Sequence, residues 1–161
     1  MISNCVFDEK TMEKIEHFLN NNKIEFKAVK YPEKVKNADE ALIHIGLPIR
    51  QIAKSLIIKT KDTFILFLLP SNKKLNTNSI SKKLKTDLKL ATTDEVFEIS
   101  GYKVGAVSPL LMKNSIPIYM DESLIKFQEV GIGSGSKGIE IILNPNDLTR
   151  LLDITVMDLT Q

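Results

Sequence analysis

Residues 53–70 have the sequence AKSLIIKTKDTFILFLLP, in which a short polar segment separates two apolar runs. In both runs, from Ala53 to Ile58 and from Thr63 to Leu69, hydrophobic residues occupy both faces of an extended chain. This pattern is typical of strands buried in the middle of a sheet rather than at its edge. Lys61 and Asp62 indicate a turn between the runs, so the stretch predicts a central β-hairpin.

Helical and strand patterns alternate on both sides of this hairpin. The expected helices lie between Asp8 and Asn22, from the cap Asn37 to Gly46, at Ser79–Lys85, at Asp94–Ile99 with Thr93 as its cap and Gly101 as its stop, and at Asn146–Leu152. The other expected strands lie between Ile24 and Tyr31 and at Ile116–Met120, Ile139–Leu143 and Ile154–Leu159. The most economical architecture is an α/β (α+β) fold, a single domain over residues 1–161 with a mixed, barrel-like central β-sheet surrounded by helices.

Composition excludes several classes of protein. A chain of 161 residues with 43% hydrophobic content has the size of one domain with a sizeable core. No apolar run approaches the roughly 20 residues that a membrane-spanning helix needs, and residues 1–8 lack the pattern of a secretory signal. These features, together with the single cysteine, Cys5, favour a cytoplasmic protein that binds no membrane. The 22 basic and 20 acidic residues nearly cancel, so any contact with nucleic acid must be local.

The usual signatures of metal sites, serine hydrolases and phosphate-binding loops are missing. His17 and His44 have no cysteine or carboxylate at ligand spacing, so we expect no metal and no organic cofactor. Gly133, Gly135 and Gly138 have the spacing of a dinucleotide-binding turn, but a strand follows them where that motif opens a helix. The glycines are therefore either a flexible hairpin connection or the wall of a pocket that a ligand approaches closely.

Lys54 is a candidate functional residue because it places an ammonium group in an otherwise apolar strand, on the same face as Leu56 and Ile58. One interpretation is that the side chain extends to water from the beginning of the strand. The other is that it lines a cleft and contacts an anionic or developing negative group, since a partly desolvated cation acts more strongly than one at the surface.

Residues 101–109, GYKVGAVSP, form a second candidate segment. Its two glycines permit backbone dihedrals that are closed to other residues, and Pro109 stiffens its exit. The segment is either a structural turn or a loop whose N–H groups point into a cleft and stabilise a carbonyl oxygen as it becomes negative.

Four short segments, taken in order, resemble the YbaK family, which is related to the editing domain inserted in bacterial prolyl-tRNA synthetase. They are QIAKSL at 51–56, GYKVGAVSP at 101–109, IYMD at 118–121 and GSKG at 135–138. The resemblance implies a free-standing deacylase that hydrolyses the ester joining a wrong amino acid to tRNA-Pro. Such an ester is already activated, so positioning and oxyanion stabilisation can replace a protein nucleophile. Water or a group of the substrate, the ribose hydroxyl or a cysteine thiol, would attack.

The resemblance also implies roles for individual residues. Lys54 matches the family lysine, Gly105 and Pro109 match its Gly-x-x-x-Pro loop, and Asp121 matches its aspartate after a strand. Asp121 has the alternative role of capping a helix that begins at Glu122. The implied catalytic residues are Lys54, Gly101 and Gly105, and the implied substrate-binding residues are Ser108, Pro109, Asp121 and Gly135.

Departures from the family pattern bear on the substrate. Leu111 and Ala106 stand where close YbaK relatives tend to have glycine, which predicts a different pocket. Relatives that edit alanine usually carry a histidine in the C-terminal third, and this chain has none beyond His44. We therefore favour cysteine over alanine as the amino acid removed.

The expected partner is aminoacyl-tRNA, with prolyl-tRNA synthetase as a further candidate and the oligomeric state left open. A lysine-rich segment, residues 73–89, either follows a tRNA backbone or is simply a solvated surface. The absence of aromatic residues between its lysines, which could stack on bases, argues for the second interpretation. Two other functions remain open: a non-catalytic module that binds a tRNA end or a synthetase, and a small-nucleotide binder. The lysines of this segment are Lys73, Lys74, Lys82, Lys83, Lys85 and Lys89.

Overall fold

The predicted hairpin is the centre of the structure. A computed structural model describes residues 2–32 and 38–161, with side chains described for residues 10–32 and 40–161. β2 (Ala53–Lys59) and β3 (Phe64–Pro70) pair antiparallel along their full length. The N–H of Thr60 donates to the carbonyl oxygen of Thr63 and closes the predicted turn.

Both faces of β3 are buried, which confirms that it is a central strand. Leu66 and Leu68 point into the main hydrophobic core, where they meet side chains from α1 and from the second sheet. Phe67 and Leu69 point the other way, into a smaller core that includes Ile80 of α3. All four β3 side chains have no exposed surface, because helices or loops cover the sheet on both sides.

The hairpin belongs to a five-stranded sheet with the order β4-β2-β3-β5-β8. Its remaining strands are β4 (Lys89–Leu90), β5 (Ile118–Asp121) and β8 (Ile154–Met157). β5 runs parallel to both β3 and β8, so the sheet is mixed. Parallel neighbours require long crossovers, and the β3-to-β5 connection accordingly carries α3, β4 and α4.

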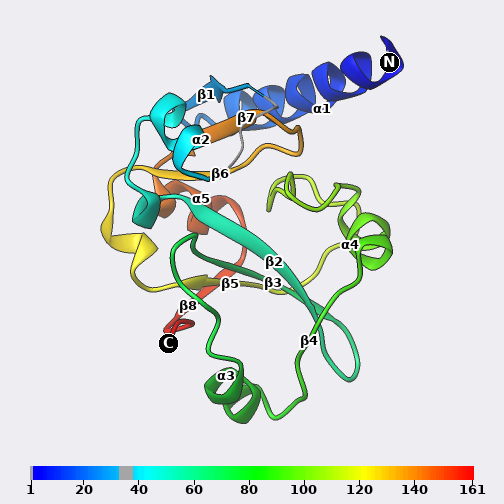
Figure 1. The fold of residues 1–161 in the computed structure, drawn as a ribbon, viewed down its shortest axis with the longest axis vertical. Helices are drawn as coiled ribbons and strands as arrows, with labels where there is room; N and C mark the ends of the chain where they lie inside the picture. Colours follow the sequence, from blue (N-terminus) through cyan, green and yellow to red (C-terminus); the bar gives the residue numbers. More distant parts are fainter. Residues whose placement is uncertain (1, 33–37) are drawn as a thin grey trace.

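A second, antiparallel sheet lies across the beginning of β2 (Figure 1) and has the order β1-β7-β6. The mixed α/β class is confirmed, but the described strands form two sheets, joined by a bridge between Ile52 and Gly131, and no closed barrel. β6 was not predicted, because two of its four residues are glycines, which disfavour a strand unless a neighbour supports it. The strands of this second sheet are β1 (Phe26–Lys30), β6 (Val130–Gly133) and β7 (Ile139–Leu143).

Helices cover the sheets as expected. In Figure 1, α1 and α2 lie at the end of the molecule with the second sheet, and α3 lies at the opposite end. None of the described helices is both long and apolar enough to cross a membrane. The expected cap Asn37 lies outside the described residues. The helical elements of the described chain are α1 (Ile2–Asn21), α2 (Ala38–Ile45), η1 (Ile49–Gln51), α3 (Thr77–Leu84), α4 (Thr93–Ser100), η2 (Leu124–Lys126) and α5 (Pro145–Leu151).

The ends of α4 fix where the 101–109 loop begins. The cap is Thr92 rather than the expected Thr93, because a glutamate three residues later completes a capping box. The Thr92 hydroxyl accepts from the N–H of Glu95, and the Glu95 carboxylate accepts from the N–H of Thr92. Gly101 ends the helix as predicted, with a φ of 80° that favours glycine.

Candidate functional site

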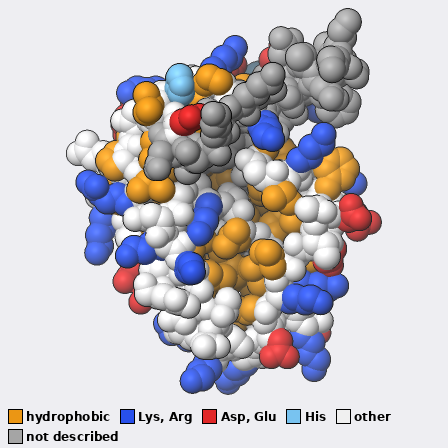
Figure 2. Space-filling model, in the orientation of Figure 1, with side chains coloured by type: hydrophobic (Ala, Val, Ile, Leu, Met, Phe, Trp, Pro, Cys, Tyr) orange, Lys and Arg blue, Asp and Glu red, His pale blue; other side chains and the backbone are white. Residues whose placement is uncertain are grey.

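A cavity of about 450 Å³ opens where α2, the beginning of β2 and the 101–109 loop meet. Figure 2 shows hydrophobic side chains gathered in a hollow on this face, over β2. The polar groups in its wall come from Lys54 and Ser55 of β2, from Ser71 just after β3, from Tyr31 just after β1, and from Glu140 of β7. Segments far apart in the sequence therefore combine into one site.

Lys54 lines this cavity, which supports the cleft interpretation over simple extension into water. The strand register places it opposite Leu69, one residue into β2. Burial lowers the pKa of Lys54, and the nearby positive charge of Lys74 lowers it further. Among the described residues, Lys54 makes no salt bridge. A partly desolvated cation without a counter-ion is suited to attract an anionic group.

Gly105 lines the cavity together with Val104 and Val107 of the same loop. Its φ of 92° is in the left-handed region that favours glycine, and an added Cβ there would meet nothing within 4 Å. The N–H of Ala106 donates to the carbonyl oxygen of Lys103 within the loop. The neighbouring N–H groups of Gly105 and Val107 are therefore the loop's candidate donors to a ligand oxygen.

The glycines near the end of β6 let the second sheet approach this loop closely. An ideal Cβ on Gly133 would lie 2.1 Å from the carbonyl oxygen of Val107, so only glycine fits there. Gly135 does not line the cavity; its Cβ would lie 2.5 Å from the ring of Tyr102. The Tyr102 hydroxyl in turn donates to the carbonyl oxygen of Leu110, 2.5 Å away, and so braces the loop.

The remaining predicted site residues lie outside the cavity wall. Gly101 forms the end of α4, and the buried Ser108 hydroxyl accepts from the N–H of Leu110. Pro109 lines a separate hollow of about 590 Å³, together with residues of α1 and β5. Gly101, Ser108 and Pro109 therefore have structural positions in or next to the loop and do not line the cavity.

Asp121 is also remote from the cavity wall and is 2% exposed. One carboxylate oxygen accepts from the N–H of Leu159, at 2.8 Å, and the other accepts from the N–H and hydroxyl of Ser123. The expected helix starting at Glu122 is not observed, since the 3-10 turn η2 begins only at Leu124. Asp121 therefore ties the end of β5 to the C-terminal segment.

Glu140 is a site residue that the sequence reasoning missed. It is 8% exposed and lines the cavity, and its carboxyl group makes no hydrogen bond or ion pair with another described residue. Burial raises its pKa to about 8, and its charge helps raise the pKa of Tyr31. The Ser55 hydroxyl, in the same wall, is likewise buried without a described partner. The signal was present, because Glu140 interrupts an apolar strand as Lys54 does.

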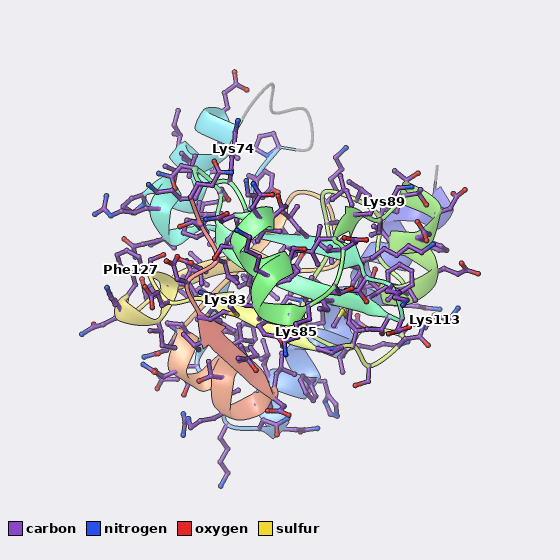
Figure 3. All side chains as sticks on the ribbon, turned by 90° about the horizontal axis from the view of Figure 1, so that it is seen from below. Lys74, Lys83, Lys85, Lys89, Lys113 and Phe127 are labelled. Atoms are coloured by element: carbon purple, nitrogen blue, oxygen red, sulfur yellow. The ribbon has the colours of Figure 1, made fainter. Side chains whose placement is uncertain are left out.

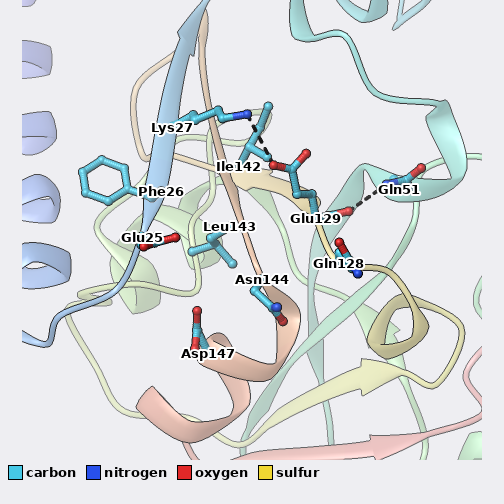
Figure 4. A pocket seen from close by; sticks show the side chains of 10 residues that line it. All are labelled: Glu25, Phe26, Lys27, Gln51, Gln128, Glu129, Ile142, Leu143, Asn144 and Asp147. Atoms are coloured by element: carbon cyan, nitrogen blue, oxygen red, sulfur yellow. Dashed lines mark hydrogen bonds and ion pairs between the residues drawn. The ribbon is translucent and has the colours of Figure 1, made fainter.

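A different hollow, of about 540 Å³, is lined by residues of β1 and β7, of the 128–129 segment and of the beginning of α5 (Figure 4). Three of its polar residues interact with one another: Lys27 pairs with Glu129 at 3.4 Å, and Gln51 donates to the backbone oxygen of Glu129 at 2.8 Å. None of the predicted site residues lies in it. Nor do three metal-binding side chains cluster anywhere among the described residues. The cavity beside Lys54 is therefore the candidate site.

Comparison with known proteins decides the family. A family model described as the aminoacyl-tRNA editing domain matches residues 32–151. The chain belongs to this family of editing domains. The YbaK-family membership predicted from the sequence is thereby confirmed, and the match covers both the β2 segment with Lys54 and the β7 segment with Glu140.

Relatives of the editing domain occur both alone and within synthetases. A proline–tRNA ligase from Caldicellulosiruptor bescii is 28% identical over 112 residues, which are 69% of this chain but 19% of the ligase. The chain thus spans about a fifth of the ligases it matches. YwhH of Bacillus subtilis, an uncharacterised protein, is 28% identical over 113 residues, 70% of this chain and 72% of that protein. A solved structure described as a candidate trans-editing enzyme for prolyl-tRNA synthetase has a TM-score of 0.85 and 27% identity, covering 94% of this chain and 97% of that one.

Proposed function

We propose that this editing domain is an aminoacyl-tRNA deacylase that hydrolyses mischarged tRNA-Pro. One observation supports the proposal: Lys54, Gly105 and Val107 line a single cavity, although about 50 residues separate Lys54 from the loop. A cation and a row of loop N–H groups around a small cavity are the parts that ester hydrolysis needs when no nucleophile is supplied by the protein.

In the proposed reaction, a water molecule or a hydroxyl of the terminal ribose attacks the ester carbonyl carbon. The carbonyl oxygen gains negative charge, and the N–H groups of Gly105 and Val107 stabilise it. The bond to the ribose oxygen then breaks, and that oxygen takes up the proton that the attacking water or hydroxyl loses. Attack by water releases the free amino acid directly, whereas attack by the ribose leaves an ester that water must still cleave.

Lys54 acts in this scheme by holding the tRNA terminus. Its ammonium group is partly buried and has no counter-ion among the described residues, so a phosphate or developing alkoxide brought near it gains a strong interaction. The amino-acid side chain lies against apolar residues of α2 and the loop, including Leu42, Ile45 and Val104. These walls suit a small, uncharged side chain, and we keep cysteine ahead of alanine as the amino acid removed.

Glu140 supplies a partner for the amino group of the substrate. Burial raises the pKa of its carboxyl to about 8, so the group is largely protonated at neutral pH. An α-ammonium group placed beside it would favour the charged carboxylate and form an ion pair in the buried site. A tRNA without an attached amino acid has no α-ammonium group, so this interaction favours aminoacylated tRNA over free tRNA.

The test is the release of amino acid from tRNA-Pro charged separately with cysteine, alanine and proline. We expect the wild-type chain to release cysteine or alanine faster than the background rate and to spare proline. The Lys54→Ala variant serves as the matched control, with its circular dichroism compared with that of the wild type. Failure of the wild type to release any of the three, with or without added prolyl-tRNA synthetase, would favour a binding module instead.

A further inference from the structure

A second lysine follows the cavity wall closely in the sequence, because Lys74 comes three residues after Ser71, which lines the cavity with Lys54. Lys74 is exposed and follows β3 by four residues, and its charge adds to the effect of burial in lowering the pKa of Lys54. Figure 3 shows Lys74 on the side of the molecule where α2 lies, well apart from Lys83, Lys85 and Lys89. The lysine-rich segment therefore does not form one continuous surface.

The backbone holds Lys74 in place from both sides. Ser71, which lines the cavity, donates through its N–H and its hydroxyl to the carbonyl oxygen of Ile52, both at 2.8 Å. The N–H of Lys73 donates to the carbonyl oxygen of Pro70 in a turn. The carbonyl oxygen of Lys74 then accepts from the N–H of Gln161. This loop is thus tied to the residues just before β2 and to the C-terminus.

Two neighbouring ammonium groups repel each other unless an anion lies between them. Among the described residues, neither Lys54 nor Lys74 forms an ion pair. Their repulsion is therefore not relieved by any described carboxylate. A phosphodiester carries one negative charge and two oxygens that can each accept from one ammonium group.

We propose that Lys74 and Lys54 together hold a phosphodiester of the tRNA 3′ end, so that Lys74 is a substrate-positioning residue. The inference rests on the proposed function, which brings that end to the cavity. It assigns Lys74 a role distinct from that of Lys82, Lys83 and Lys85, which belong to α3 or its end, away from α2.

The first experiment compares the deacylation kinetics of wild type, Lys74→Gln and Lys74→Arg on the mischarged tRNA-Pro that the wild type hydrolyses. The matched control is Lys61→Gln, which removes the same charge from the exposed turn of the β2–β3 hairpin. We expect Lys74→Gln to raise KM about tenfold with kcat nearly unchanged, as for loss of one charge-assisted contact made in the bound ground state. Lys74→Arg should recover most of that loss. Equal KM values for Lys74→Gln and Lys61→Gln would overturn the inference.

The second experiment measures binding without hydrolysis, using a short acceptor-stem RNA that ends in CCA. One version has a normal final phosphodiester, and the other has a neutral methylphosphonate at that linkage. Wild type and Lys61→Gln should prefer the charged version about tenfold, and Lys74→Gln should lose most of that preference. The salt dependence of binding should also become shallower in Lys74→Gln, by about 0.7 in the log–log slope.

The outcomes of the two experiments separate the two proposals. Full retention of the preference in Lys74→Gln would overturn the role of Lys74. Binding of AMP as tightly as the RNA would also overturn it, in favour of a small-nucleotide site. Absence of hydrolysis by the wild type counts against the proposed deacylase alone, because the RNA comparison does not depend on hydrolysis.

Discussion

The carbonyl oxygen of Val107 lies only 2.1 Å from the place where a Cβ on Gly133 would be. No side-chain rotation can relieve a contact with backbone, so Gly133→Ala must move either β6 or the 101–109 loop. We expect this variant to lose about 3 kcal/mol of unfolding free energy and to lose activity, because the loop forms a wall of the cavity. Urea denaturation and the deacylation assay measure the two effects.

Gly105→Ala is the matched control for that variant. Its added Cβ would meet nothing within 4 Å, so only the positive φ of 92° makes it unfavourable. We expect a loss of about 1 to 2 kcal/mol, from backbone strain rather than from filling the cavity. Equal losses of stability in the two variants would show that the contact with Val107 is not limiting.

Lys54→Ala should remain folded and lose most of the proposed deacylase activity, by about a hundredfold or more. The side chain is partly exposed and makes no salt bridge with a described residue, so its removal breaks no described ion pair. Initial rates on mischarged tRNA-Pro, beside a thermal melt, provide the measurement. Normal activity in a folded variant would remove Lys54 from the mechanism.

Glu140 should make stability depend on pH. Its pKa rises from an ordinary 4.5 to about 8 in the folded protein, so the folded state binds more protons than the unfolded state between these values. Stability should therefore be greatest below about pH 4.5 as far as this group is concerned, and fall as pH rises towards 8, by at most about 1.4 kcal/mol per pH unit. Glu140→Gln should flatten that decline in denaturation measured at pH 5, 6.5 and 8.

Activity gives a second readout for Glu140. Because the carboxylate is proposed to pair with the α-ammonium group, Glu140→Gln should raise KM for the aminoacyl-tRNA more than it lowers kcat. Binding of uncharged tRNA-Pro should change little. A variant that binds charged and uncharged tRNA as the wild type does would limit Glu140 to a structural role.

Asp121→Asn should destabilise the chain while leaving its catalysis largely intact. The carboxylate accepts from Leu159 and Ser123 and is nearly fully buried, so weakening these bonds should cost about 2 to 3 kcal/mol. Asp62→Asn, in the exposed hairpin turn, is the control. A loss of kcat at a temperature where Asp121→Asn is fully folded would instead support the substrate-binding role that the resemblance implies.

Local patterns explain what could be predicted. The apolar runs around Lys61 and Asp62 predicted the central hairpin, and Gly101 predicted the end of α4; both depend on near neighbours. β6 could not be predicted in this way, because Gly131 and Gly133 carry no strand preference and the strand depends on pairing with β7. The cap of α4 is Thr92 and not the predicted Thr93, because both are threonines and only Thr92 has Glu95 three residues later to complete a capping box.

The candidate site was predicted only in part. The sequence by itself determined the family, the presence of a cation in an apolar strand and a glycine-rich loop, since each is contained in a short segment. Only the tertiary structure decided that Lys54, Gly105 and Glu140 share one cavity, while Pro109 and Asp121 lie outside its wall. The physical reason is that the site forms where two sheets and a loop pack together, and such packing brings together residues whose separation in sequence gives no sign of their distance in space.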